Sequence, residues 1–240
     1  MFTAALPLPA MIGTMIDLVA LDMAGTTIDD HGSVYVALRR SVEETGATVS
    51  DADLQQWMGT DKVEAIGALM RLGGGNPTAD SVNTAFGRFR ELLAQSYRDE
   101  PPLALAGVVD ALHTLRDRGI RVALTTGFDD GVAVPLLESL GWRIGADELL
   151  DAVVTTSDVS AGRPAPYLIH HAMELTGVAD VHRVLAAGDT IVDLAAARNA
   201  GVIAVGVASG ALSRDELERY PHDHVLDSVA ELPGLDETRG

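Results

Sequence analysis

The chain has 240 residues, of which 47% are hydrophobic and 22% are charged, a composition that can bury one large core or a core with a smaller second lobe. Its formal net charge of −18 argues against nucleic acid and anionic membrane surfaces as partners. The absence of cysteine excludes disulfides and thiol chemistry, and it suits a cytoplasmic protein.

The N-terminal part predicts an extension followed by one strand. Residues 1–14 are apolar and contain proline, but they carry no basic segment. We therefore interpret them as a loose extension and not as a signal peptide. The apolar run 18–21 then predicts a buried strand. No apolar run in the sequence is long enough to span a membrane.

A helical segment follows this strand. Residues 30–102 contain no convincing strand pattern, and they predict helices at 32–46, 51–57, 61–72 and 78–98. A Gly-Gly-Gly-Asn-Pro break at 73–77 interrupts the pattern, and two prolines at 101–102 end it. We expect an all-helical cap over 30–102, inserted after the first strand of a core formed by 15–29 and 103–240.

The remainder of the chain alternates strands and helices. Further buried strands are predicted at 121–124, 152–154, 184–187 and 202–207, and helices near 131–141, 165–177 and 191–200. Repeated strand–helix–strand units predict an α/β fold with a doubly wound parallel sheet. A cleft between this sheet and the cap is the expected ligand site, because parallel sheets bind ligands at the carboxyl edge.

Polar residues stand where four of these elements end or begin. Asp22 follows the first strand within Asp-Met-Ala-Gly-Thr-Thr, and Thr126 follows the next core strand. Arg163 precedes a predicted helix, where a guanidinium can hold a phosphoryl group or neutralise a carboxylate. Asp189 and Asp193 are four residues apart, so we expect them to share a helical face and to suit Mg²⁺. Taken singly, each residue also fits an ordinary role as a cap, a turn residue or a surface charge.

Lys62 is the only lysine of the chain, since every other Lys or Arg position is arginine. Arginine stays charged at any working pH, whereas a lysine can lose its proton and attack a carbonyl to form an imine. Considered alone, Lys62 is more simply an ordinary surface lysine. Thr60 or Asp61 is positioned to cap a helix that begins beside it. The positive end of that helix favours a neutral amine, whereas the charge of Asp61 favours a protonated one.

The order of these motifs resembles that of the haloacid dehalogenase (HAD) superfamily of hydrolases, from about Ile16 onward. The resemblance implies a HAD-like core with a helical cap, in which Asp22 attacks phosphorus and forms an aspartyl phosphate. It further implies that Thr126 and Arg163 bind the phosphoryl group. The positions that it assigns to Mg²⁺ are Asp22, Ala24, Asp189 and Asp193.

Two departures from the common superfamily pattern look like phosphonoacetaldehyde hydrolase, or phosphonatase, and its relatives. Ala24 stands where superfamily phosphatases carry a second aspartate, and Arg163 replaces the usual lysine of the third motif. Similar runs also occur at Gly-Arg-Pro-x-Pro, 162–166, and at Arg-Asn-Ala-Gly, 198–201. Within Met-Gly-x-x-Lys, 58–62, the Schiff-base lysine of that family falls on Lys62.

The residue chemistry points the same way. In a phosphomonoesterase the second aspartate protonates the leaving alkoxide, so Ala24 handicaps ester cleavage. Cleavage of a phosphonate must instead expel a carbanion, and an imine β to the C–P bond accepts those electrons as an enamine. We therefore expect the cap to bring Lys62 over Asp22 when it closes and excludes water.

The resemblance also implies a substrate pocket, although two positions depart from its pattern. Ala65 and Phe128 stand where the family has a catalytic histidine and a tyrosine, and the missing histidine favours a related phosphonate with its own amine or hydroxyl over phosphonoacetaldehyde itself. His31 is a candidate replacement for the histidine, with a solvated surface residue as the simpler interpretation. The substrate-binding positions are Ala24, Gly25, Thr26, Met58, Gly127, Phe128 and Met173, with core packing as the alternative for the two methionines.

The leading hypothesis is thus an Mg²⁺-dependent C–P bond hydrolase that acts on a small-molecule phosphonate. The first alternative is a HAD-type phosphatase for a small phosphate monoester, whose activity would survive Lys62→Arg. The second is a non-enzymatic binding module, which the retained carboxylates at 22, 189 and 193 argue against. A dehalogenase is weaker still, because its phosphoryl and metal residues would be idle. The resemblance further implies a homodimer formed through the cap.

Overall fold

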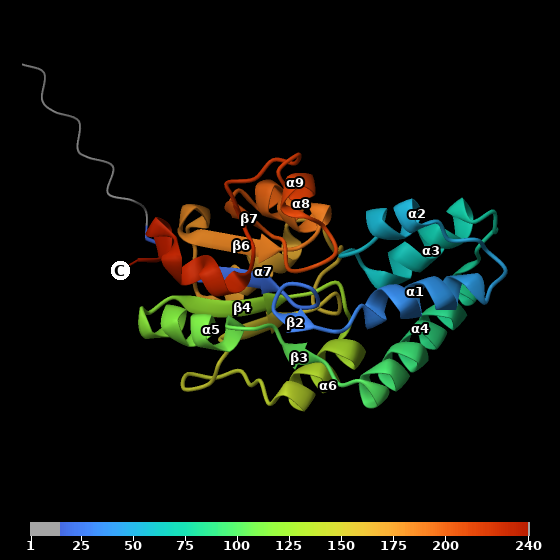
Figure 1. The fold of residues 1–240 in the computed structure, drawn as a ribbon, viewed down its shortest axis with the longest axis horizontal. Helices are drawn as coiled ribbons and strands as arrows, with labels where there is room; N and C mark the ends of the chain where they lie inside the picture. Colours follow the sequence, from blue (N-terminus) through green and yellow to red (C-terminus); the bar gives the residue numbers. More distant parts are fainter. Residues whose placement is uncertain (1–14, 240) are drawn as a thin grey trace, which may run out of the picture.

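A computed structural model describes residues 15–239, so the predicted extension 1–14 lies outside the described residues. Six parallel strands form the main sheet, in the order β5-β4-β1-β6-β7-β8 (Figure 1). The strands are β1 (Leu18–Asp22), β4 (Arg121–Thr125), β5 (Ala152–Val154), β6 (Val184–Gly188), β7 (Ile203–Val207) and β8 (His224–Leu226). The chain adds β4 and β5 on one side of β1, and then β6, β7 and β8 on the other side. Parallel sheets bind ligands at such a change of direction, so the end of β1 is the expected position of a site.

Alternate residues of β1 face the two layers that cover the sheet. Leu18 and Ala20 pack in one apolar cluster, and Val19 and Leu21 pack in another. The first cluster contains the buried faces of α7 (Tyr167–Thr176) and α8 (Ile191–Ala200), and the second contains that of α5 (Val108–Asp117). Because side chains alternate along a strand, this arrangement requires the continuous apolar run that the sequence shows at 18–21.

The remaining elements of the core are short or peripheral. They are α6 (Asp130–Leu140), α9 (Arg214–Leu217) and the 3₁₀ turns η1 (Val181–Arg183), η2 (Val229–Gly234) and η3 (Asp236–Thr238). A separate antiparallel ribbon pairs β2 (Ile28–Asp29) with β3 (Leu103–Ala104), at the two points where the chain leaves and re-enters the core.

Four helices lie between β2 and β3, and Figure 1 shows them gathered at the right, away from the sheet. They are α1 (Ser33–Glu43), α2 (Asp51–Gln56), α3 (Lys62–Leu72) and α4 (Ala79–Asp99). Local signals in the sequence set their starts: Ser50 caps α2, Asp61 caps α3 and Thr78 forms a capping box with α4. Helix α1 packs against both α4 and α3, and the buried residues of these helices belong to the same apolar cluster as Val19 and Leu21.

The parallel α/β sheet and the predicted helices are confirmed, with ends that shift by a few residues. The sequence analysis did not identify α5, the edge strand β8 or the β2–β3 ribbon. The ribbon strands have two residues each, which is too short for an alternating pattern to be recognised. Within residues 15–239, no helix has the length and apolar character needed to cross a membrane.

Candidate active site

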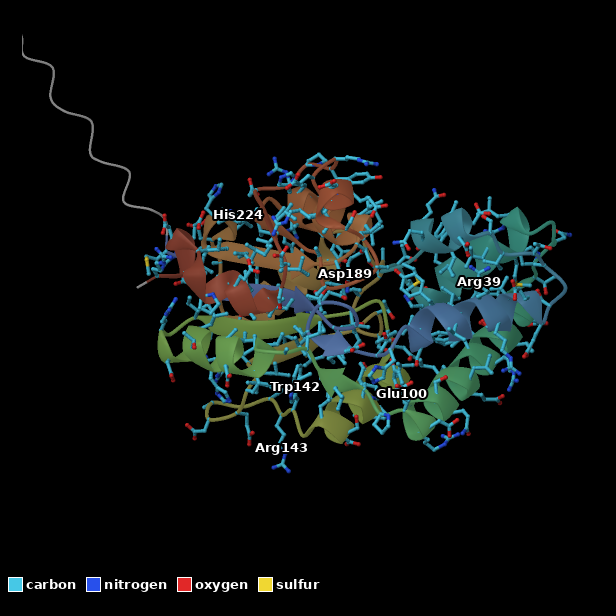
Figure 2. All side chains as sticks on the ribbon, viewed as in Figure 1. Arg39, Glu100, Trp142, Arg143, Asp189 and His224 are labelled. Atoms are coloured by element: carbon cyan, nitrogen blue, oxygen red, sulfur yellow. The ribbon has the colours of Figure 1, made fainter. Side chains whose placement is uncertain are left out.

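A cavity of about 270 Å³ lies where the ends of β1, β4 and β6 meet the helices α1 and α3. In Figure 2, Asp189 lies at the end of the sheet that faces these helices. The predicted site residues that line the cavity are Asp22, Ala24, Gly25, Met58, Lys62, Thr126, Gly127, Phe128 and Asp189. Residues more than 160 positions apart in the sequence thus converge on one small space.

Asp22 is buried beside the guanidinium of Arg163, whose Nη2 donates to Asp22 Oδ1 at 2.5 Å. Burial raises the pKa of Asp22 to about 6, although the positive charge of Arg163 opposes the rise. Arg163 also pairs with Asp193 and donates to the Thr125 carbonyl at 3.1 Å. The carboxylate of Asp22 is therefore held in one orientation and is largely ionised at neutral pH, as a nucleophile requires.

The three acidic side chains of the site form a compact donor set. Asp22, Asp189 and Asp193 are buried, and one oxygen from each lies within 4.8 Å of the others. Burial, followed by the charges of Asp22 and Asp193, raises the pKa of Asp189 well above its ordinary value. A hard divalent cation fits such an all-oxygen group, and its charge would relieve this repulsion. Ala24 has no side-chain donor, so only its backbone carbonyl is available to a metal.

The three carboxylates differ in what they already bind. Both oxygens of Asp193 are used, one by Arg163 and the other by the backbone and hydroxyl of Thr190. Asp189 accepts the Thr26 hydroxyl on Oδ1 at 2.9 Å. Asp189 precedes Thr190, the N-cap of α8, so the two carboxylates converge through the helix start and do not share a helical face as the spacing suggested. Asp193 is thus suited to orienting Arg163 and Thr190, and it leaves Asp22 and Asp189 as the carboxylates with oxygens available to a metal.

Lys62 is the first residue of α3, and its side chain is only 4% exposed. Its Nζ donates to the Thr60 carbonyl at 2.9 Å and lies 5.7 Å from the centre of the Phe128 ring. Burial, and then the charge of Arg163, lower the pKa of Lys62 to about 8, while Asp22 and Asp61 oppose this change. The surface-lysine interpretation is wrong, because Lys62 is buried and lines the cavity.

The loop that precedes Lys62 contacts the core directly. Gly59 has a φ of 77°, and a Cβ at this position would lie 2.6 Å from Thr190 Oγ1. A Cβ at Gly127 would lie 2.5 Å from the Thr60 carbonyl oxygen. Both positions therefore require glycine, because Gly59 lies against core side chains and Gly127 lies against the backbone of the loop before Lys62. These contacts place Lys62 over the cavity.

Besides Asp193, three predicted site residues do not line the cavity. Met173 is on α7, packed in the apolar cluster of Leu18 and Ala20 on one face of the sheet, so its role is core packing. Thr26 is fully buried and uses its hydroxyl on Asp189, so it orients a carboxylate instead of lining the cavity. Arg163 lies beneath Asp22, and its charge reaches the cavity through that carboxylate.

Other residues line the cavity although the sequence analysis did not single them out. They are Asp29, Asp30, Gly32, Val34, Tyr35, Gly59, Leu105, Thr190, Ser209, Gly210 and Ala211. Most come from the turn before α1 and from the loop after β7, which carry no spacing that would link them to Asp22. His31 contacts the Pro101 carbonyl oxygen at 3.3 Å and Asp29 at 3.6 Å, consistent with a surface position.

A family model described as haloacid dehalogenase-like hydrolase matches residues 16–201. The chain belongs to this hydrolase family. A phosphonoacetaldehyde hydrolase from Lactiplantibacillus plantarum is 30% identical over 262 residues, covering 92% of this chain and 95% of that protein. A phosphonoacetaldehyde hydrolase from Bacillus cereus strain AH187 is 31% identical over 216 residues, covering 81% of this chain and 76% of that protein. The crystal structure of a hydrolase from Pseudomonas syringae aligns with a TM-score of 0.81 at 25% identity. The alignment covers 92% of this chain and 98% of that one.

Arg163 pairs with two buried carboxylates, those of Asp22 and Asp193. We expect Arg163→Met to lower the free energy of unfolding by about 3–5 kcal/mol, because two buried carboxylates lose their counter-charge. Arg214→Met is the matched control, since Arg214 pairs with Asp227 at side-chain exposures of 39% and 74%. We expect that loss to stay below about 1 kcal/mol. Urea unfolding in metal-free buffer measures both, and equal losses would contradict the buried-pair assignment.

Proposed function

We propose that this HAD hydrolase cleaves the C–P bond of phosphonoacetaldehyde or of a closely related small phosphonate. In this proposal residues 30–102 act as a cap that closes over a core made of 15–29 and 103–240. Asp22 accepts the phosphoryl group, and Lys62 forms an imine with the aldehyde. A cytoplasmic location and a homodimer remain predictions.

One observation carries the proposal: the single lysine of the chain is buried at the same cavity as Asp22, with a pKa near 8. A phosphatase has no use for a partly neutral amine at this position. An imine-forming enzyme requires one, because only the unprotonated amine attacks a carbonyl. The relatives named phosphonoacetaldehyde hydrolase support the same chemistry.

The reaction then follows from two nucleophiles. The amine of Lys62 replaces the carbonyl oxygen of the aldehyde, which leaves as water, and forms an imine β to phosphorus. With the imine nitrogen protonated, the Asp22 carboxylate attacks phosphorus, the C–P bond breaks, and its electron pair passes into the iminium to give a neutral enamine. Protonation at carbon and hydrolysis release acetaldehyde from Lys62, while water releases orthophosphate from Asp22. Ala24 is compatible with this route, because no alkoxide leaves and no acid is needed there.

Binding of the phosphonate is assigned to the core residues. Thr126 lines the cavity and its hydroxyl oxygen accepts the Phe128 N–H at 3.2 Å, while the Gly127 N–H has no protein acceptor among residues 15–239. Mg²⁺ would be held by Asp22 and Asp189, with Asp193 in support, and would supply positive charge against the phosphonate oxygens. Arg163 adds a positive charge beneath Asp22, so the dianionic substrate meets a site that its carboxylates alone would repel.

The pKa of Lys62 sets a pH dependence for imine formation. Below about pH 8 the amine is mainly protonated and unreactive, and above about pH 8 it is mainly neutral. We therefore expect the initial rate of imine formation to rise about tenfold per pH unit below this value and to level above it. Borohydride trapping at short, fixed times between pH 6 and pH 10 gives the profile. A midpoint near that of an ordinary lysine would mean that burial does not activate the amine.

Product analysis tests the proposal. Phosphonoacetaldehyde, incubated with the protein and Mg²⁺, should yield equal amounts of orthophosphate and acetaldehyde. A panel of small phosphate monoesters serves as the comparison, since the alternative function is a HAD phosphatase. Turnover of the esters without release of acetaldehyde from the phosphonate would favour that alternative.

A further inference from the structure

The carboxylate of Asp189, labelled in Figure 2, lies against two segments of the chain that have no side chain where they meet it. A Cβ at Gly25 would lie 2.6 Å from Asp189 Oδ2, and a Cβ at Gly210 would lie 1.9 Å from the same oxygen. Both separations are shorter than the 3.0 Å below which Cβ contacts are essentially never found. The carboxylate therefore occupies the space that a side chain would fill at either position.

The two glycines differ in why they are needed. Gly25 lies in the turn after β1 and has a φ of 87°, so its backbone conformation favours glycine as well. Gly210 lies in the loop after β7 and lines the cavity, and it is not one of the positive-φ glycines among residues 15–239. The three heavy atoms nearest to an added Cβ there all belong to the side chain of Asp189. Its requirement for glycine thus comes from Asp189 and not from the backbone conformation.

Hydrogen bonds join these two segments to each other and to the carboxylate. Ser209 Oγ donates to the Gly25 carbonyl oxygen at 2.7 Å. The hydroxyl of Thr26, the next residue after Gly25, donates to Asp189 Oδ1 at 2.9 Å. The Ser209 bond therefore fixes how far the loop after β7 stands from the turn after β1, and the Asp189 carboxylate contacts both.

Asp189 needs such a seat because its neighbours carry the same charge. One oxygen each of Asp22, Asp189 and Asp193 lie within 4.8 Å of one another. Repulsion at this range would turn a freely rotating carboxylate away from the others. Asp193 is seated in the same manner, since a Cβ at Gly188 would lie 2.2 Å from its Cγ. A carboxylate that is already held in place does not have to be ordered when a cation binds, which strengthens binding.

Resting on the metal site of the proposed function, we infer that Ser209 and Gly210 are positioning residues for the divalent cation. They act through the Asp189 carboxylate, which they hold toward Asp22 so that both carboxylates serve one ion. A loop that only completed the fold would contribute to stability and leave the affinity for the metal unchanged. Metal affinity, measured separately from stability, therefore distinguishes the two roles.

Gly210→Ala and Ser209→Ala test the inference, with Gly87→Ala and Ser139→Ala as matched controls. Gly87 is on α4, with nothing within 4 Å of an added Cβ. Ser139 Oγ donates to the Leu136 carbonyl oxygen at 2.7 Å, outside this cavity. Each metal-free protein is titrated with Mn²⁺, which takes the same oxygen ligands as Mg²⁺, and the EPR signal of the free ion gives the dissociation constant. Thermal unfolding of the metal-free proteins reports stability.

We expect Gly210→Ala to raise the Mn²⁺ dissociation constant by about 10–100-fold, because the added methyl group turns the Asp189 carboxylate away. Ser209→Ala should raise it by about tenfold, because the loop after β7 loses its tie to the Gly25 carbonyl. The two controls should bind Mn²⁺ as the parent protein does. Gly210→Ala should fold, since the added methyl displaces the end of a side chain and not the backbone.

Parent-like Mn²⁺ affinity in Gly210→Ala, with or without a loss of stability, would overturn the inference and leave the proposed function intact. If Gly210→Ala does not fold, Ser209→Ala decides the question by the same measurement. A parent protein that binds no Mn²⁺ would overturn the metal site and this inference together. Normal Mn²⁺ binding without release of acetaldehyde from phosphonoacetaldehyde would overturn the proposed function alone.

Discussion

Replacing Lys62 by arginine should abolish the release of acetaldehyde from phosphonoacetaldehyde. We expect a loss of about 10⁴-fold or more, because removal of a covalent nucleophile leaves only binding and electrostatic effects. Arginine keeps a positive charge at the cavity, so the substitution removes the reactive amine without removing the charge. Coupled assays of acetaldehyde and of orthophosphate measure the effect.

The same variant separates the proposed function from its alternative. A HAD phosphatase would use Asp22 and the metal site without the amine, so its turnover of phosphate monoesters would survive Lys62→Arg. Circular dichroism and thermal unfolding check that the larger guanidinium is accommodated in the cavity. A folded variant that still releases acetaldehyde at the parent rate would rule out an imine at Lys62.

Replacing Asp22 by asparagine should stop turnover at a different step. The amide does not accept a phosphoryl group, so we expect kcat to fall by about 10⁴-fold or more on phosphonates and on phosphate monoesters. Lys62 is intact in this variant, so imine formation should continue. Borohydride should then trap an adduct that retains phosphorus, which intact mass distinguishes from a two-carbon adduct left after cleavage.

This pair of variants dissects the two nucleophiles. Lys62→Arg should lose the adduct, and Asp22→Asn should keep the adduct but lose cleavage. If Asp22→Asn trapped a phosphorus-free adduct, C–P cleavage would precede or bypass the aspartate. If Asp22→Asn trapped no adduct at all, imine formation at Lys62 would itself require the Asp22 carboxylate. The assignment of separate roles to the two residues would then fail.

Much of the fold was predictable because its signals are local. The run 18–21 is apolar at every position, as a strand covered on both faces must be. Asp61 precedes a helical pattern, and in the structure it accepts the Glu64 N–H at 2.8 Å as the cap of α3. The carboxylates at 22 and 189 were predictable as neighbours because both follow parallel strands.

The remaining features depend on tertiary packing. Met173 matched a pocket position by resemblance, but the pattern of α7 gives no indication of which layer its methionine faces. Tyr35 occupies an ordinary helical position, and only the contact of α1 with α3 brings it to the cavity. The burial of Lys62 likewise follows from the close approach of Gly59 to Thr190. These two residues are 131 positions apart, so the sequence gives no sign that they are in contact.

Borohydride trapping on the parent protein tests the central claim most directly. The protein is incubated with phosphonoacetaldehyde and Mg²⁺, reduced, and then analysed by intact mass and peptide mapping. Because the chain has one lysine and one α-amine, each adduct can be assigned to a single nitrogen. We predict one reduced adduct, on Lys62, which is absent from Lys62→Arg. Protein that remains unmodified at Lys62, or that is modified only at the α-amine, would contradict the account.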